Sequence, residues 1–366
     1  MAVQRKEKTV YYELLRIIAI LCVVFNHTAG FYSFTYADFG SWAWFVRLLV
    51  SLFSKIGVPV FFMISGALLL NRDRSLSWLL SRVVHTGLQL AAITALIMVG
   101  KYFVYGVRPT LKSYIIFLYT GTKLSSQLWF MYAYLAFLLS IPLLDRFVKN
   151  FDRVGMRYLI FCYVISQIAL IAQYVFLNDK YSFNSRLFPT WMATDIFLYP
   201  VIGWYLAKHP EETTRRRVAV WTISAGLFIA LLCGTVYLMG YRNGGSMEDL
   251  NYQRFHNYFV LFPSVAVFLI VQKLDAHIPP KLYPVIRVLG GASFGVYMIH
   301  ILVKDLPFMK RGLDYLSNSL GMDHLLSNIL YVVAAWLLST FFVVIYQTIV
   351  RLLSECIRKI RNQKLS

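Results

Sequence analysis

The stretch "ELLRIIAILCVVFNHTAG", residues 13–30, has the apolar run of a membrane helix, yet it contains an arginine and a histidine. An ionisable side chain is costly in hydrocarbon, so inside a membrane segment it indicates a functional site with a partner. Arg16 and His27 are eleven residues apart. On an α-helix this spacing returns them to within about 20° of one face, about 16 Å apart along the axis. One helix is therefore predicted to present two polar groups to one interior path.

The composition indicates a polytopic membrane protein. Of the 366 residues, 58% are hydrophobic and only 14% are charged, which excludes a soluble globule of this size. The net charge of +19 does not indicate nucleic-acid binding, because the basic residues form short clusters between apolar runs, as in loops that orient membrane helices. The four cysteines are scattered without the spacing of metal ligands. We therefore expect the lipid bilayer as a partner, no nucleic acid and no metal.

About ten runs of mainly apolar residues are long enough to cross a bilayer. They lie near 10–33, 43–70, 80–105, 127–145, 156–177, 188–207, 217–240, 256–274, 288–308 and 326–350. The predicted fold is an all-α integral membrane protein of about ten transmembrane helices, a single membrane domain over residues 1–366 with no appended soluble domain. Most lysines and arginines fall in the loops on the side of the N-terminus, so both termini are predicted to be cytoplasmic.

Several motifs resemble a known family. They are "LLRIIAILCVVFNH" at 14–27, "GVPVFFMISGALLL" at 57–70, "LWFMYAYLAF" at 128–137 and "GGASFGVYMIH" at 290–300, with a weaker fifth, "ATDIFLYPVIGWYLA", at 193–207. In this order they resemble the membrane acyltransferase-3 family, the bacterial O-acyltransferases that modify surface glycans and lipids. The resemblance covers most of the chain and is to the short, single-domain O-acetyltransferases. It implies a multi-pass protein of the bacterial cytoplasmic membrane.

The resemblance also implies a reaction and a donor site. The reaction is transfer of an acyl group, usually acetyl from cytosolic acetyl-CoA, to a hydroxyl of a glycan, a glycolipid or a similar lipid-linked acceptor. By the resemblance, Arg82 with Arg72 or Arg74 would bind the donor phosphates, since the guanidinium binds phosphate oxygens through two hydrogen bonds. Arg16 would meet the pantetheine or acyl end. In the alternative interpretation, Arg72 and Arg74 only anchor their loop on the cytoplasmic side.

His27 is the candidate catalytic base. An imidazole, with an unperturbed pKa of about 6.5, can accept a proton from the acceptor hydroxyl and pass it to the leaving thiolate. Direct transfer needs only this base, whereas a double displacement would make His27 the acyl carrier. The structural alternative is a histidine that ends its helix and bonds a carbonyl or a lipid headgroup.

A second polar cluster follows one stripe of the span at 288–308. It consists of Ser293, Tyr297, His300 and Lys304. Their spacing of four, three and four residues places them on one face. In a functional interpretation, Tyr297 and His300 orient the acceptor, bond the thioester oxygen or set the tautomer of His27. In a structural one, the stripe joins helices inside the bundle.

Two further polar or aromatic residues have open roles. Asp195, within an apolar run, is a candidate partner for Arg16 or for a histidine, or one half of an ion pair that only fixes the bundle. Trp129 either lines the acceptor entrance or anchors its helix at the interface.

The rival hypothesis is a transporter. Relatives of the family's membrane domain occur fused to serine racemases of vancomycin-resistance systems, which implies amino-acid (serine-like) transport as an alternative. Proline-broken helices around a midplane site would suit it, but the two halves of the sequence show no inverted repeat. The enzyme is the favoured interpretation, and the sequence specifies no oligomeric state.

Overall fold

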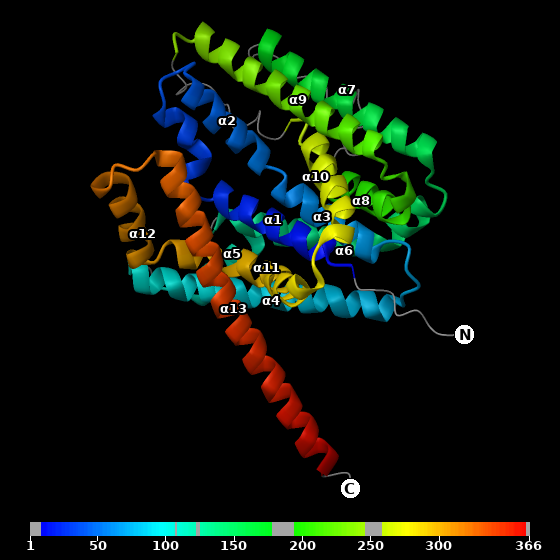
Figure 1. The fold of residues 1–366 in the computed structure, drawn as a ribbon. Coiled ribbons are helices and arrows are strands. Elements are labelled where there is room, and N and C mark those ends of the chain that lie inside the picture. The colour runs from blue at the N-terminus through cyan, green and yellow to red at the C-terminus, as the bar shows by residue number, and fades with distance from the viewer. Residues whose placement is uncertain (1–8, 107, 122–124, 178–193, 246–257, 364–366) are drawn as a thin grey trace.

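The chain folds into a bundle of helices, with no strand in the part that the structure describes (Figure 1). The structure, a computed structural model, describes residues 9–106, 108–121, 125–177, 194–245 and 258–363. The main helices are α1 (Tyr11–Asn26), the 3₁₀ helix η1 (Ala29–Tyr36), α2 (Trp42–Ser54), α3 (Gly57–Leu69), α4 (Leu76–Tyr105), α5 (Leu111–Thr120), α6 (Trp129–Lys149), α7 (Arg153–Leu177), α8 (Leu198–Lys208), α9 (Arg215–Arg242), α10 (Leu261–Leu274), α11 (Tyr283–Lys304), α12 (Pro307–Asp314) and α13 (His324–Gln363). The predicted all-α class is confirmed for these residues.

Seven helical segments of the described chain are long and apolar enough to cross a membrane. They are Trp42–Leu69, Leu76–Phe103, Trp129–Lys149, Arg153–Ala172, Arg215–Arg242, Pro280–Lys304 and His324–Cys356. Helix α1 and η1 also pass as a pair that is bent by 58°, which gives eight if the pair is one span. The protein is therefore a multi-pass membrane protein.

Two of the ten predicted spans correspond to shorter helices in the described residues. The prediction at 188–207 falls partly on residues outside the description and contains α8, of 11 residues. The prediction at 256–274 likewise contains α10, of 14 residues. An apolar run that is buried all round is equally typical of a short helix enclosed by others. The count of ten therefore stays a prediction.

Helix α1 lies inside the bundle, against α3, α10, α11 and α13. None of its residues is exposed. Its contact with α11 depends on Gly290, where a Cβ atom would lie only 2.5 Å from Glu13 Cβ. Small residues at such contacts let helix backbones approach closely, so a glycine brings α11 against the helix that contains Arg16 and directly precedes His27.

Helices α3 and α8 make the most extensive helix contact in the described chain. A Cβ on Gly66 would lie 1.9 Å from Pro200 O, and one on Gly203 would lie 2.1 Å from Met63 O. These neighbours are backbone atoms, which cannot move aside as a flexible side chain can. The pair of glycines therefore sets the distance between α3 and α8.

Replacing either glycine is expected to destabilise the protein. Gly66→Ala and Gly203→Ala should each lower the free energy of unfolding by about 1–3 kcal/mol or more, because an added methyl group overpacks a tight contact. Thermal unfolding of the purified protein in detergent measures the change. Gly226→Ala and Gly234→Ala in α9 are the matched controls, since nothing lies within 4 Å of a Cβ at these positions. Equal losses in all four variants would contradict the packing argument.

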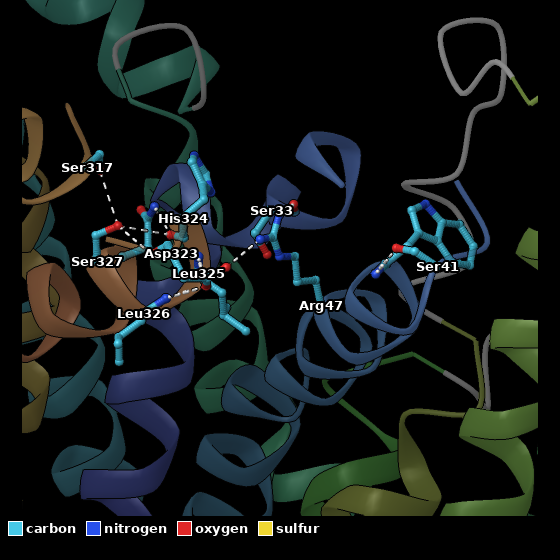
Figure 2. A network of polar contacts seen from close by, with 11 residues as sticks. Ser33, Ser41, Arg47, Ser317, Asp323, His324, Leu325, Leu326 and Ser327 are labelled. Atoms are coloured by element: carbon cyan, nitrogen blue, oxygen red, sulfur yellow. Dashed lines mark hydrogen bonds and ion pairs between the residues drawn. The ribbon is translucent and has the colours of Figure 1, made fainter. Parts of the chain in front are cut away.

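A polar clamp fixes the bent end of the first span (Figure 2). Arg47 of α2 donates from Nη1 to the carbonyl oxygen of Ser33 in η1 at 3.2 Å and from Nη2 to Asp323 Oδ2 at 2.5 Å. Asp323 Oδ1 accepts from the backbone amides of Leu325 and Leu326 at 2.9 and 3.1 Å, so it also caps the N-terminus of α13. One arginine thus joins η1, α2 and α13.

The charge of Asp323 contributes to this clamp. Burial alone would oppose its ionisation, but the amides of Leu326 and Leu325 and the Arg47 guanidinium outweigh burial and lower the pKa of the carboxyl. Because the folded-state pKa is lowered, the stabilisation is fully present above about pH 4. It is lost as the pH falls through the lowered pKa.

Removing the Arg47 charge tests the clamp. Arg47→Gln should lower the unfolding temperature at pH 7 by a few degrees, since a partly buried charged hydrogen bond is worth about 1.5–3 kcal/mol. At pH 3, the difference in unfolding temperature between Arg47→Gln and the wild type should be smaller than at pH 7. Arg351→Gln is the control, because Arg351 pairs with Glu355 on an exposed helix surface and such pairs contribute about 0–1 kcal/mol. An Arg47→Gln protein as stable as this control would refute the role of the clamp.

Candidate active site

Helix α1 holds the two polar residues of the opening motif near its opposite ends. Arg16 lies in its second turn and forms an ion pair with Glu13, Nη1 to Oε1 3.3 Å, three residues earlier. His27 follows the last helical residue, where the chain bends into η1. Arg16 therefore pairs within its own helix and not with Asp195, as one interpretation of the sequence had proposed.

His27 contacts His300 of α11. His27 Nδ1 and His300 Nε2 are 3.0 Å apart, and the two ring centroids are 5.1 Å apart. His300 has no exposed surface. The structure therefore brings the histidine of the second polar cluster directly against that of the first.

The carbonyls around His300 determine which nitrogen of His27 is available. His300 Nδ1 lies 2.7 Å from the carbonyl oxygen of Tyr297 and 3.2 Å from that of Val296. A carbonyl only accepts, so this nitrogen has the proton, and in the neutral ring Nε2 is then an acceptor. His27 must donate to it from Nδ1. The Nε2 lone pair of His27 is then the one that can accept a proton.

His27 lines a cavity of 490 Å³, called here the histidine cavity. Its lining is rich in polar groups, among them those of Lys55, Gln127, Gln167 and Asp195. Asp195 lines this cavity together with Lys55 and forms no ion pair with the described residues. Aromatic side chains complete the lining.

Trp129 and Gln127 are two of the residues that line the histidine cavity. Trp129 lines the cavity and is 39% exposed. Gln127 is buried, and its amide nitrogen Nε2 has no hydrogen-bond partner in the described part of the chain. A buried amide without a partner is rare, so a donor is available for a bound molecule.

Arg16 lines a second cavity, of 360 Å³, called here the arginine cavity. Arg82, His85 and Gln89 of α4 and Tyr134 of α6 face it as well. Two guanidinium groups and other hydrogen-bonding side chains therefore gather at the end of α1 that is distant from His27.

The other two predicted donor-binding arginines lie outside the arginine cavity. Arg74 donates from Nη2 to the carbonyl oxygen of Leu68 at 3.0 Å and lies over the Trp78 ring, 4.1 Å from its centroid. Burial, followed by the nearby charges of Arg72 and Arg82, lowers the pKa of Arg74. Arg72 lines a separate cavity of 240 Å³. The arginines thus form an electropositive cluster, but only Arg82 shares a cavity with Arg16.

The histidine and arginine cavities share a wall. Phe130 of α6 and Tyr297 of α11 line both of them. Their rings meet edge to face with centroids 5.0 Å apart, and the Tyr297 hydroxyl donates to the carbonyl oxygen of Gln127. Two aromatic rings therefore separate the Arg16 side of the protein from the His27 side.

The remaining members of the second polar cluster have structural contacts. Ser293 donates to the carbonyl oxygen of Leu289 in its own helix at 3.4 Å and lines neither cavity. Lys304 pairs with Asp305 at 3.2 Å. Of the stripe, Tyr297 and His300 belong to the site.

Sequence reasoning missed several residues of the site, among them Lys55, Gln127 and His85. Lys55 is a cation inside the apolar stretch 42–70, which is itself an indicator of a site. Gln127 directly precedes the motif "LWFMYAYLAF", but one polar residue at a helix start gives no signal. His85, near the start of the apolar run 80–105, lines the arginine cavity.

One group of possible metal ligands occurs in the described residues, formed by His209, Glu211 and Glu212. It lies between α8 and α9 and lines neither of the two cavities. Glu212 already binds Arg217 and accepts from the Tyr205 hydroxyl, so an ion-pair cluster accounts for this group.

The bundle, its buried ionisable residues and its two adjoining cavities define a multi-pass membrane protein with an internal site. The chain belongs to the acyltransferase-3 family, because the family's model, described as an acyltransferase domain, matches residues 9–348. The resemblance in the sequence motifs is thereby confirmed. Comparison with curated proteins and with solved structures gave no match.

Proposed function

We propose that the protein is an acetyl-CoA-dependent O-acyltransferase that modifies a hydroxyl of a glycan, a glycolipid or a similar lipid-linked acceptor. The main support is His27, whose Nε2 can accept a proton while His300 holds Nδ1. The family supports acyl transfer. The donor, the acceptor and the roles of the residues are the parts that we propose.

The arginine cavity is the proposed donor site. Arg82 binds phosphate oxygens of the acyl donor, and Arg16 holds its pantetheine arm. Arg72 and Arg74 raise the local positive potential and attract the polyanionic donor. Arg74 lies close to Arg72 and Arg82, and Arg82 shares a cavity with Arg16, so the positive-inside rule favours this end as cytoplasmic, together with both termini. By the family resemblance, we assign the protein to a bacterial cytoplasmic membrane.

The histidine cavity is the proposed acceptor site. The ring of Trp129 offers an apolar face to a sugar ring, while the carboxylate of Asp195 and the amide of Gln167 can bond its hydroxyls. A cavity with few convergent polar groups and aromatic walls is typical of small-molecule recognition.

In the proposed reaction, the acyl group moves directly from donor to acceptor. His27 Nε2 takes the proton of the acceptor hydroxyl as its oxygen attacks the thioester carbonyl carbon. The carbon–sulfur bond then breaks, and the imidazolium returns the proton to the thiolate of CoA. Gln127 Nε2, which has no partner among the described residues, donates to the oxyanion of the tetrahedral intermediate. For this, the thioester must pass between Phe130 and Tyr297.

The deciding experiment is acetyl-CoA turnover by the purified protein in nanodiscs, followed by release of free thiol. The wild type should hydrolyse acetyl-CoA slowly without an acceptor. His27→Ala should reduce the rate by about 10²–10⁴-fold, the usual contribution of a general base, with acetyl-CoA still bound. His277→Ala, at an exposed position in the short 3₁₀ helix Asp275–His277, is the control. If the wild type neither binds nor cleaves any acyl-CoA, the proposal fails, and amino-acid uptake into proteoliposomes tests the transporter alternative.

Variants of His300 test its role in positioning His27. His300→Leu cannot accept from His27 Nδ1, so kcat should fall by about 10–100-fold with KM for acetyl-CoA unchanged, because the wrong tautomer of a catalytic histidine is inactive. His300→Gln can accept through Oε1 and should restore part of kcat. Steady-state kinetics of the two variants measures the difference. Equal activity in both would contradict the tautomer argument.

A further inference from the structure

A cavity of 670 Å³ lies between the first turns of α7 and α9, away from the proposed active site. We call it the lateral groove. Arg153 and Arg157 of α7 and Arg216 and Arg217 of α9 line it, together with Glu212. It shares no lining residue with the histidine cavity or the arginine cavity. Figure 1 shows α7 and α9 along one side of the bundle.

The lateral groove has an excess of positive charge. Its one carboxylate, Glu212, is bound by Arg217. The side chains of Arg153, Arg157 and Arg216 form no ion pair or hydrogen bond with the described residues. Among the described residues that line the groove, four guanidinium groups therefore face one carboxylate, and three of the four have no ion-pair partner. Orientation of helices in the membrane requires basic loops, but it does not require them to converge on a cavity.

Apolar side chains follow the arginines along the helices. Ile160 of α7 and Val220 and Trp221 of α9 line the groove about one turn farther from the helix starts. Beyond them, exposed apolar residues such as Phe161 and Leu227 continue along the two helices. The α9 span is the least enclosed of the seven, with 17% of its most apolar window buried. The order from cationic to apolar matches that of an amphiphile in a bilayer, with tryptophan at the level of the headgroups.

We infer that the lateral groove binds an anionic phospholipid. The phosphodiester lies among the arginines of α7 and α9, which form charge-assisted hydrogen bonds with its oxygens. The acyl chains follow the exposed apolar faces of the same helices. A zwitterionic headgroup is disfavoured, because its ammonium would meet uncompensated guanidinium groups. A soluble phosphate would leave the apolar part of the groove unused.

The test is lipid retention by the purified protein, measured by native mass spectrometry, with phosphatidylglycerol and phosphatidylcholine as probes. The wild type should retain phosphatidylglycerol in preference to phosphatidylcholine and should unfold at a higher temperature in its presence. Arg157→Gln/Arg216→Gln should weaken retention by at least about tenfold, since each basic residue near the membrane contributes about 1 kcal/mol. Arg146→Gln/Arg215→Gln is the matched control. It removes the same charge from the same end of the bundle, but neither residue lines the groove.

The outcomes separate the possible ligands. Loss of phosphatidylglycerol in the groove variant, with retention in the control, supports the site. Equal loss in both variants overturns it in favour of a general basic surface. Displacement of the lipid by inorganic phosphate or glycerol 3-phosphate at millimolar concentration overturns it in favour of a soluble-anion site. Equal retention of phosphatidylcholine overturns the selectivity for anionic lipid. None of these readouts depends on acyl transfer, so the inference stands or fails separately from the proposed function.

Discussion

The cost of placing ionisable side chains in hydrocarbon is the constraint on which this bundle depends. Helix α1 contains Arg16 near its start, His27 directly follows its last residue, and neither can face lipid tails without a large penalty. The other helices therefore enclose α1, and none of its residues is exposed. Glycine at 290 lets α11 approach α1 closely, and α11 in turn supplies His300. The packing that shields Arg16 and His27 from lipid therefore also brings His300 against His27.

Two cavities on either side of an aromatic wall suit a reaction between unlike partners. Under the proposed function, a polyanionic acyl donor needs fixed cations, and Arg16 and Arg82 line the cavity on one side. A hydroxyl-rich acceptor needs neutral and acidic hydrogen-bonding groups, which the cavity of His27 and Asp195 supplies on the other. Under the proposed function, the donor binds on one side of Phe130 and Tyr297 and the acceptor on the other, and only the thioester passes between these two rings. Such an arrangement limits water access to the reacting carbonyl.

The outer surface of the bundle faces lipid, so it is stabilised differently from the interior. Its helices expose apolar side chains because the surrounding solvent is lipid, so burial within the protein is not required for stability. Close contact between helices then depends on small residues, as at Gly66 and Gly203, and on a few polar clamps, as at Arg47 and Asp323. Basic residues at helix ends meet lipid headgroups, which is why a cationic hollow such as the lateral groove faces outward.

The sequence by itself determined the membrane class, the family and the helix that contains Arg16, whereas His27, predicted inside the same helix, directly follows its last residue. These depend on composition and on the local 3.6-residue period, which needs no knowledge of neighbours. It also placed Tyr297 and His300 on one stripe. Only the tertiary structure decided that His300 contacts His27, 273 residues away, that Arg16 pairs with Glu13, and that Gln127 and Lys55 face the same cavity. Contacts between helices depend on which faces pack together, and that choice is made by side-chain fit across the whole bundle rather than by any local pattern.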